Sequence, residues 1–400
     1  MDTNNLLSEV KRLAAELHSE TISRRRHLHA HPELSFKETQ TSAYVEACLR
    51  DIGLEPVTGI VGTGLTALIK GNKPDKRTVA LRADMDALPI TETNNVPYKS
   101  TNPGVMHACG HDVHTSSLLS AAKILYTLRH SFEGTIKLIF QPGEEKTPGG
   151  ASLMIAEGVL QNPAPDGIIG QHVMPLLETG KVGFREGMYM ASTDELHVTV
   201  FGKGGHGAMP EYCIDPVLIS AHIIVALQQV VSRMASPKMP SVLSFGRVIA
   251  EGATNVIPNT VQMEGTFRTM DEPWRKKALA SMKKMAEGIA EAMGGRCDFR
   301  IEAGYPYLKN DPALTRRSRL AAEEYMGPEN VVDLDLWMAG EDFAYYAQQT
   351  PGCFYRLGTR NEAKGIVSGV HTPTFDIDEA ALVQGAGLMA WLALKELEQN

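Results

Sequence analysis

Helical and extended patterns alternate along the first 170 residues, and this alternation limits the possible folds more than any other feature of the chain. Apolar residues recur at helical spacing through 6–17, and a second helical pattern over 39–52 stops at Gly53, a residue type that commonly ends helices. Further helical patterns cover 114–128 and 150–157, and short apolar runs typical of strands cover 65–69, 78–82, 135–140 and 167–170. We therefore expect an α/β domain built around a mainly parallel sheet.

A different order of elements begins near Gly187. The patterns there run strand, helix, strand, strand, helix, strand, at 195–201, 216–235, 241–248, 261–269, 273–293 and 300–303. This is the ferredoxin-like order, and the α/β pattern resumes after Gly304. We expect a discontinuous first domain of residues 1–187 and 304–400, with residues 188–303 inserted as a second domain.

Charge and composition exclude several classes of protein. The 39 basic and 47 acidic side chains give a net charge of −8, so a global basic surface for nucleic acid is missing. The longest apolar runs, such as 223–227, are far shorter than the ~20 residues of a membrane helix, and the polar N-terminus has no apolar segment of a secretory signal. The five cysteines are scattered and form no C-x-x-C pair. We expect a cytoplasmic protein without disulfides that binds neither nucleic acid nor a membrane.

Reactive side chains gather in residues 106–114, which read MHACGHDVH. Cys109 and His111 are two positions apart at the start of a predicted helix, so both side chains can face one ion. A helix N-terminus also favours the thiolate form of cysteine, which is the form that binds metals. For this pair alone, a buried structural cysteine beside helix-capping polar residues is an equally good interpretation.

Two adjacent carboxylates, Glu144 and Glu145, follow the predicted strand 135–140 in the sequence QPGEE. Neighbouring side chains of an extended chain point in different directions, so one carboxylate could bind a metal while the other acts on a bound water as a general base. The simpler interpretation of two adjacent glutamates is a solvated acidic turn.

Two single histidines complete the candidate metal ligands. His172 follows the predicted strand 167–170, and His371 occurs late in the chain. Each alone would be a core or loop histidine, but ligands at four separate strand ends would converge at the carboxyl edge of an open α/β sheet. One cysteine, one glutamate and three histidines suit zinc, manganese or a similar divalent ion. Asp84 and Asp86, at another strand end, suit carboxylates that orient histidine ligands.

The glycine-rich stretch 202–207, GKGGHG, formally matches the G-x-G-x-x-G pattern of dinucleotide-binding proteins. The stretch continues into AMPE and not directly into a helix, and no acidic residue lies near position 227 to bind a ribose. We therefore reject dinucleotide binding. Without other information, His206 would be a solvent-facing residue of a flexible turn, and Arg268 would be a surface charge at a strand end.

Six short motifs occur in order along nearly the whole chain. They are RRHLHAHPE (25–33), RADMDALP (82–89), MHACGHD (106–112), QPGEE (141–145), GGHG (204–207) and MAGEDF (338–343). Together they resemble the aminoacylase / hippurate hydrolase family of metallopeptidase-like amidohydrolases, which includes plant auxin-conjugate hydrolases. The resemblance implies a zinc-exopeptidase-like α/β catalytic domain with a dinuclear metal site, and an inserted ferredoxin-like lid that often mediates dimerisation. Gly143, where many relatives have alanine, is a small departure from the family pattern.

The resemblance also assigns roles to individual residues. It implies that Cys109 is a thiolate bridging two divalent ions and that Glu144 is the general base. The other implied metal ligands are His111, Glu145, His172 and His371. His206 of the lid would reach the active site of a partner subunit and stabilise the oxyanion. Asn255 and Arg268 would hold the free carboxylate of the substrate.

The implied function is metal-dependent hydrolysis of the amide bond of N-acyl-L-amino acids, with acetyl, benzoyl or similar acyl groups, releasing a free amino acid and a carboxylic acid. We expect an enzyme that uses two divalent ions (zinc, manganese, cobalt or nickel) and forms a homodimer or higher homo-oligomer. Two alternatives stay open: a dipeptidase or carboxypeptidase of the same fold, and a catalytically inactive metal-binding homologue. The presence of every catalytic group, Glu144 included, argues against the second.

Overall fold

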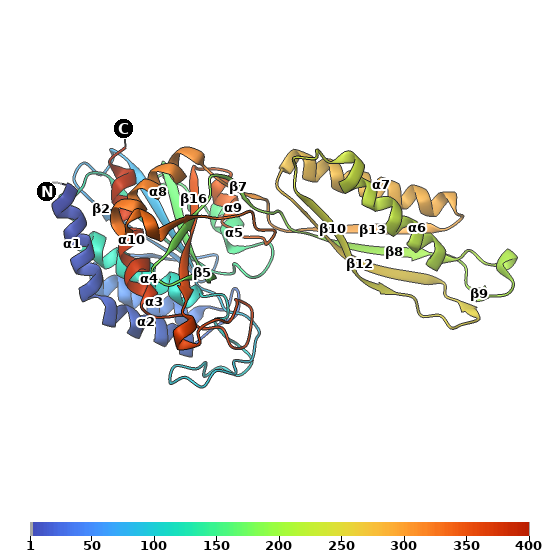
Figure 1. The fold of residues 1–400 in the computed structure, drawn as a ribbon, viewed down its shortest axis with the longest axis horizontal. Coiled ribbons are helices and arrows are strands. Elements are labelled where there is room, and N and C mark those ends of the chain that lie inside the picture. The colour runs from blue at the N-terminus through green and yellow to red at the C-terminus, as the bar shows by residue number, and fades with distance from the viewer. Residues whose placement is uncertain (1–2, 400) are drawn as a thin grey trace. The chain divides into compact units, whose positions relative to one another are not determined.

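The computed structural model describes residues 3–399, which form two compact units (Figure 1). The first unit contains the chain up to Gly187, Lys309–Asp335, and the chain from Asp342 onwards. The second unit contains Met188–Leu308 and Leu336–Glu341. It therefore runs past residue 303, the end that the sequence patterns indicate for the inserted domain, and it takes in a later short segment that no pattern indicated.

An eight-stranded mixed sheet forms the centre of the first unit, in the order β1-β2-β4-β3-β5-β16-β6-β15. Its strands are β1 (Val57–Ile60), β2 (Gly64–Lys70), β3 (Thr78–Asp84), β4 (Thr135–Gln141), β5 (Gly167–Glu178), β6 (Val182–Phe184), β15 (Val331–Asp333) and β16 (Gly352–Arg360). The central strands β4, β3, β5 and β16 run parallel, which confirms the expected sheet for its centre. Antiparallel pairs occur on both flanks. Where only a few residues connect two paired strands, as 61–63 connect β1 and β2, the strands must run antiparallel, because a parallel pair needs a much longer connection.

Helices pack around this sheet, and two of them are buried on almost every side. The helices are α1 (Thr3–Glu16), α2 (His18–Ala30), α3 (Thr39–Ile52), α4 (His111–Thr127), α5 (Gly150–Ala156), α8 (Pro312–Met326), α9 (Ala344–Ala347) and α10 (Ala381–Leu397). Nearly every side chain of α4 and α10 is buried, and these two helices pack on each other and on β3. Thr115 of α4 donates a hydrogen bond to the carbonyl of Asp84 (2.7 Å), so α4 begins at the carboxyl end of β3. Gly53 ends α3 with a φ of 99°, as the sequence predicts.

The second unit has the expected ferredoxin-like order. Its four-stranded antiparallel sheet, β10-β12-β8-β13, is covered on one face by α6 and α7 (Figure 1). These elements are β8 (Asp194–Phe201), α6 (Pro216–Gln229), β10 (Ser241–Ile249), β12 (Thr260–Thr269), α7 (Glu272–Ala292) and β13 (Arg296–Ala303). A pair of short strands in the same unit is β9 (Gly205–His206) with β11 (Val256–Ile257). Another pair, β7 (Gly187–Met190) with β14 (Leu308–Asn310), consists of residues at which the chain passes from one unit to the other.

One helical stretch of the described residues, Pro216–Met234, is long and apolar enough to cross a membrane by length and composition alone. The sequence expectation rested on uninterrupted apolar runs, and Ser220 and His222 interrupt this one. A single such stretch is weak support for a membrane segment, because core helices of globular units have the same composition. Ile219 and Ile223 of this helix are buried in the core of the second unit.

Candidate metal centre

Cys109 and His111 lie on either side of Gly110, in the turn that begins α4. Gly110 has a positive φ of 84°, and a Cβ atom there would lie 2.6 Å from the side chain of Val173, so this turn requires glycine. Cys109 and His111 are both buried. Because α4 begins at His111, and not at residue 114 as expected, this histidine belongs to the first turn of the helix.

Asp86 holds the loop that carries Glu144 and Glu145. Its Oδ1 accepts the backbone N–H of Glu144 (3.0 Å), and its Oδ2 accepts the backbone N–H of Glu145 (2.9 Å). Asp86 also faces Nδ1 of His111 (3.2 Å) and accepts the hydroxyl of Ser35 (2.6 Å). Burial alone would raise the pKa of Asp86, but these hydrogen bonds and the charge of His111 lower it. An ionised Asp86 therefore orients both the histidine and the two glutamates.

A second buried carboxylate, Glu38, supports the same loop, although no sequence pattern indicated it. Its Oε1 accepts the backbone N–H of Gly143 (2.8 Å), and its Oε2 accepts the hydroxyl of Thr63 (2.8 Å). Gly143 has a φ of 63°, and a Cβ atom there would lie 2.4 Å from the ring of Phe36. In this chain the aromatic ring thus occupies the space that an alanine methyl group would need.

The two later histidines lie in places that the sequence patterns did not indicate. His172 lies inside β5, which continues to Glu178 because it pairs with β16 along most of its length. His371 lies in an irregular segment between β16 and α10, with a φ of 60° and a side chain that is 53% exposed. Its backbone N–H donates to the carbonyl of Ala108 (2.7 Å). The expectation of ligands at four strand ends is therefore wrong for both histidines.

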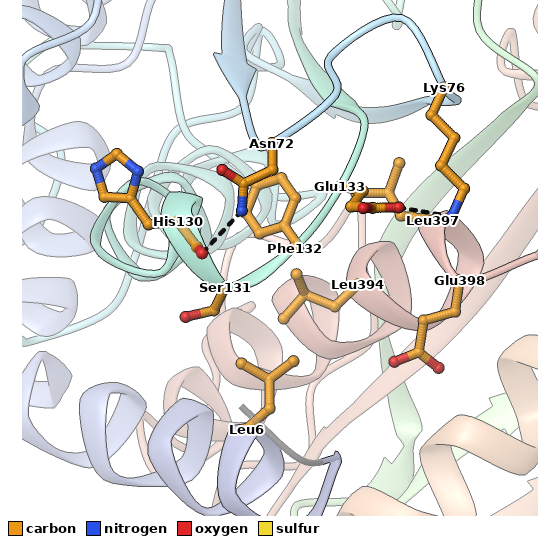
Figure 2. Close-up of a pocket in the computed structure, with 10 residues that line it drawn as sticks. All are labelled: Leu6, Asn72, Lys76, His130, Ser131, Phe132, Glu133, Leu394, Leu397 and Glu398. Carbon is orange, nitrogen blue, oxygen red and sulfur yellow. Dashed lines mark hydrogen bonds and ion pairs between the residues drawn. The ribbon is translucent and has the colours of Figure 1, made fainter.

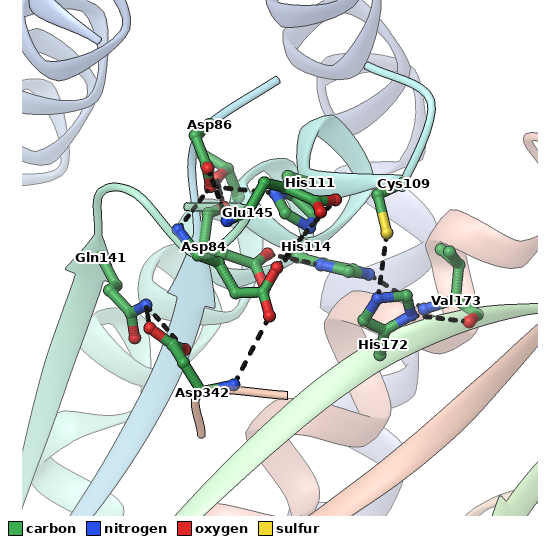
Figure 3. A network of polar contacts seen from close by, with 12 residues as sticks. Asp84, Asp86, Cys109, His111, His114, Gln141, Glu145, His172, Val173 and Asp342 are labelled. Carbon is green, nitrogen blue, oxygen red and sulfur yellow. Dashed lines mark hydrogen bonds and ion pairs between the residues drawn. The ribbon is translucent and has the colours of Figure 1, made fainter. Parts of the chain in front are cut away.

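The candidate ligands nevertheless converge from four parts of the chain. The sulfur of Cys109 lies 3.5 Å from Nε2 of His172 and 3.3 Å from Nε2 of His371. Oε1 of Glu145 lies 3.3 Å from Nε2 of His371 and 3.9 Å from Nε2 of His111. Cys109 thus belongs to two groups of three donors, one with His111 and His172 and one with Glu145 and His371. Within each group the donor atoms lie within 4.8 Å of one another, and Figure 3 shows the first group with Glu145 beside it.

The buried donor atoms fit a divalent cation. Nδ1 of His111 is hydrogen-bonded to Asp86, and Nδ1 of His172 donates to the carbonyl of Val173 (2.8 Å), which leaves Nε2 of both rings for a metal. Nε2 of His111 and Oε1 of Glu145 are buried and make no hydrogen bond. Buried polar atoms without partners are costly, and a metal ion between these donors would satisfy both.

Carboxylates surround His111 and Cys109 and shift the pKa of both side chains. Burial by itself would lower the pKa of His111, but the carboxylates of Asp84 and Asp86 outweigh burial and raise this pKa to about 10. Burial, together with the negative charge of Glu145, raises the pKa of the Cys109 thiol well above its usual range. A divalent ion would reverse both effects, because it stabilises the thiolate and takes the place of the imidazole proton.

Asp84 lies behind the candidate ligands and has both oxygens occupied. Its Oδ1 accepts Nδ1–H of His114 (2.6 Å), and its Oδ2 accepts the guanidinium of Arg82 (2.6 Å). Nε2 of His114 in turn accepts the backbone N–H of Val173 (2.9 Å), next to His172. Asp84 is therefore suited to support the backbone around a ligand and not to bind an ion itself.

Gln141 and Asp342, which lie side by side in Figure 3, extend this network. Nε2 of Gln141 donates to both oxygens of Asp342 (2.9 and 2.7 Å), and the guanidinium of Arg82 donates to both residues. The backbone N–H of Asp342 donates to Oε1 of Glu144 (3.4 Å). Gln141 and Asp342 both lie in sequence motifs, but the sequence did not indicate that they hold Glu144 in place.

His206, Asn255 and Arg268 lie in the second unit. His206 is exposed on β9, and its backbone pairs with Val256 of β11. Asn255 directly precedes β11, and its carbonyl accepts the backbone N–H of Gly207 (2.8 Å), next to His206. The backbone N–H of Ala208 donates to Nδ1 of His206 (3.1 Å), which leaves the proton of the neutral ring on Nε2. Arg268 is half-buried on β12.

A cavity of about 380 Å³ lies near the starts of strands β3 and β4 in the first unit (Figure 2). Its walls include Leu6 of α1, Leu394 of α10, and residues that precede β3 and β4, among them Lys76 and Glu133, which form an ion pair (2.8 Å). These residues precede the strands, whereas the candidate ligands and Glu144 gather where β3 and β4 end. None of the candidate ligands lines this cavity, so we do not assign the site there.

Residues 80–395 match the family model of Peptidase family M20/M25/M40, and the chain belongs to this family. It is therefore an enzyme of a hydrolase family, and the resemblance stated from the six motifs is confirmed.

Individual relatives are similar along most of their length. The N-acyl-L-amino acid amidohydrolase of Geobacillus stearothermophilus is 45% identical over 76% of this chain and 81% of its own. Thermostable carboxypeptidase 2 of Saccharolobus solfataricus is 39% identical over 98% of this chain and 99% of its own. The crystal structure of the YXEP protein of Bacillus subtilis, titled a dinuclear metal-binding peptidase of the M20 family, matches with a TM-score of 0.83 at 35% identity, covering 96% of this chain and 100% of that one. The expected fold class is confirmed.

Proposed function

We propose that this chain hydrolyses the amide bond of N-acyl-L-amino acids with acetyl, benzoyl or similar acyl groups, using two divalent ions. The observation that carries this function is the sulfur of Cys109, which belongs to two groups of metal donors beside Glu144. The similarity to an N-acyl-L-amino acid amidohydrolase and to the YXEP protein, a dinuclear metal-binding peptidase, supports it. Zinc, manganese, cobalt and nickel are the candidate ions, because thiolate, imidazole and carboxylate donors bind all of them.

The proposed ligands are Cys109, His111 and His172 for one ion, and Cys109, Glu145 and His371 for the other. When bound, these ions would polarise the scissile carbonyl and acidify the attacking water. Neither of these two groups includes Glu144, although its carboxylate lies close to His111 and Glu145.

Glu144 is the proposed general base. It takes the proton of the attacking water and delivers that proton to the leaving amine. Its Oε1 accepts the N–H of Asp342, whereas its Oε2 lies 4.0 Å from Nε2 of His111, on the side of the metal donors. The backbone bonds from Glu144 and Glu145 to Asp86 keep this carboxylate in place through the cycle.

The second unit is the proposed lid. Nε2–H of His206 donates to the oxyanion that forms as the carbonyl is attacked. Arg268 and Asn255 hold the free carboxylate of the substrate, for which the planar guanidinium of arginine is well suited. The tautomer set by Ala208, with the proton on Nε2, is the one that this role of His206 requires.

A homodimer formed through the second unit is part of the same proposal. Helix α6 exposes Val217, Leu218 and Val225, and the edge strand β10 exposes Val242 and Val248. Exposed apolar side chains and an unpaired strand edge suit an interface with a second copy.

The five cysteines are free thiols, which fits the reducing cytoplasm that we propose as the location.

A substrate panel tests this function. We expect N-acetyl and N-benzoyl amino acids to be hydrolysed by protein loaded with each of the four ions in turn. The matched amides without a free carboxylate should react roughly 10–100-fold more slowly, because a hydrogen bond to a charged group contributes ~1.5–3 kcal/mol. Faster release of C-terminal residues from peptides, or faster cleavage of dipeptides, would favour the alternative that the related carboxypeptidase supports. A panel without any turnover would favour an inactive homologue.

Replacing His206 with alanine should lower kcat by ~10²–10³ while metal content stays unchanged, because the lost group acts on the transition state. His130→Ala, beside the cavity of Figure 2, is the control and should keep full activity. If His206 acts across the dimer, mixing His206→Ala with Glu144→Gln should restore part of the activity, because one site of each mixed dimer holds both groups. Exchange of subunits is shown separately by mass tagging. Exchange without recovery would exclude the cross-subunit arrangement.

A further inference from the structure

The segment that carries His371 has no helix or strand to hold it. His371 lies in the irregular chain between Gly369 and Asp378, with its backbone in the left-handed region and its side chain half exposed. A metal ligand needs a fixed position, and a non-glycine residue with a positive φ persists only where its surroundings impose it. The hydrogen bond from the N–H of His371 to Ala108 fixes one end of the segment.

A buried arginine from the first sequence motif fixes the other end. Arg25 is fully buried, and its guanidinium donates to Asp112 (2.8 Å) and to Asp376 (2.8 Å). Asp376 also accepts the hydroxyl of Tyr98 (2.8 Å), whose ring lies over Arg25. Asp112 directly follows His111 in α4, so Arg25 joins the helix turn that carries one candidate ligand to the segment that carries another.

Two further hydrogen bonds hold the backbone between His371 and Asp376. The N–H of Thr93 donates to the carbonyl of Pro373 (2.9 Å), and the side chain of Asn94 donates to the carbonyl of Phe375 (2.9 Å). The irregular segment is therefore bound along its length to the loop that follows β3, and Asp376 pairs with the buried guanidinium of Arg25.

We propose that Arg25, through its ion pairs with Asp112 and Asp376, is a positioning residue that holds His371 within reach of the ion shared with Cys109 and Glu145. This rests on the proposed function, because it requires the two-ion site. The ion held by Cys109, His111 and His172 does not depend on this segment, since none of these ligands lies in it. Loss of the Asp376 contact therefore weakens one of the two ions and leaves the other unchanged.

The test measures the dissociation constants of Co²⁺ for the full chain by calorimetric titration. Asp376→Ala removes the hydrogen-bonded ion pair of Arg25 with the His371 segment. It leaves the buried pair of Arg25 and Asp112 intact, and it leaves the longer pair of Arg25 with Glu379 (3.5 Å), which lies beyond the end of that segment. We expect one Co²⁺ to bind about tenfold more weakly, the size typical of losing a residue that orients a metal ligand, and the other to bind as in the wild type. The thiolate-to-cobalt absorption of Cys109 should remain.

The matched control is Asp378→Ala, two residues further along the same segment. Asp378 pairs with Lys364 (2.8 Å), whereas Arg25 pairs with Asp112, Asp376 and Glu379, so both Co²⁺ ions should bind normally. Tyr98→Phe removes only the hydroxyl bond to Asp376, and it replaces Asp376→Ala in the test if that variant does not fold. It should weaken the binding of the same one Co²⁺ ion.

Unchanged affinities in Asp376→Ala, equal weakening of both ions, or the same loss in Asp378→Ala would each overturn the positioning role. If the wild type itself binds only one Co²⁺, the proposed two-ion site fails along with this inference. A wild type with two ions and an unaffected variant would overturn the inference alone.

Discussion

Replacing Glu144 with glutamine should lower turnover by a factor of ~10²–10⁴ while both metal ions stay bound. Loss of a general base typically has an effect of this size, and an amide cannot take up the water's proton. The change should leave the loop in place, because Glu144 and Glu145 are held through backbone N–H groups bonded to Asp86. Steady-state kinetics and metal analysis of the same preparation would measure both quantities.

Glu145→Gln is the matched control for this variant. The two glutamates are adjacent and carry the same side chain, but only Oε1 of Glu145 lies 3.3 Å from His371 in a donor group with Cys109. Glu145→Gln should therefore lose affinity for one ion, whereas Glu144→Gln should not. Metal loss in Glu144→Gln, with retention in Glu145→Gln, would show that the two roles are exchanged.

Removal of the divalent ions should abolish hydrolysis, and reloading should restore it. Without an ion, the pKa of the Cys109 thiol is raised and the pKa of His111 is about 10. Both side chains then hold a proton, whereas a side chain must be deprotonated to bind a metal. The folded state should also lose stability, since an ion present at a hundred times its dissociation constant stabilises the native protein by about 2.7 kcal/mol. Activity and the thermal midpoint, measured before and after chelation, test both effects.

Cys109→Ser should reproduce part of the chelator's effect, because it removes the donor that both groups share. Cys48→Ser, at a half-buried cysteine of α3 outside either group, is the control and should bind both ions. Full activity of metal-free protein would contradict the two-ion mechanism.

Most helices and strands could be predicted from the sequence because their signals are local. The helix over residues 39–52, with its terminal Gly53, and the six elements of the second unit follow from patterns between near neighbours. Predictions failed where an element depends on a distant partner. β5 extends past residue 170 because it pairs with β16, and β1 pairs antiparallel with β2 because only the short connection 61–63 joins them.

The sequence by itself determined which chemical groups are present: a thiol, imidazoles and paired carboxylates in motifs specific enough to identify the family. Only the tertiary structure decided that Cys109 lies in two donor groups, since it meets His371 from 262 positions away. The structure alone also showed which distant segments Glu38 and Arg25 contact, because nothing near either residue in the chain indicates those partners. Ligand geometry, ring tautomers and shifted pKa values depend on distances between segments remote in sequence, and folding alone sets those distances.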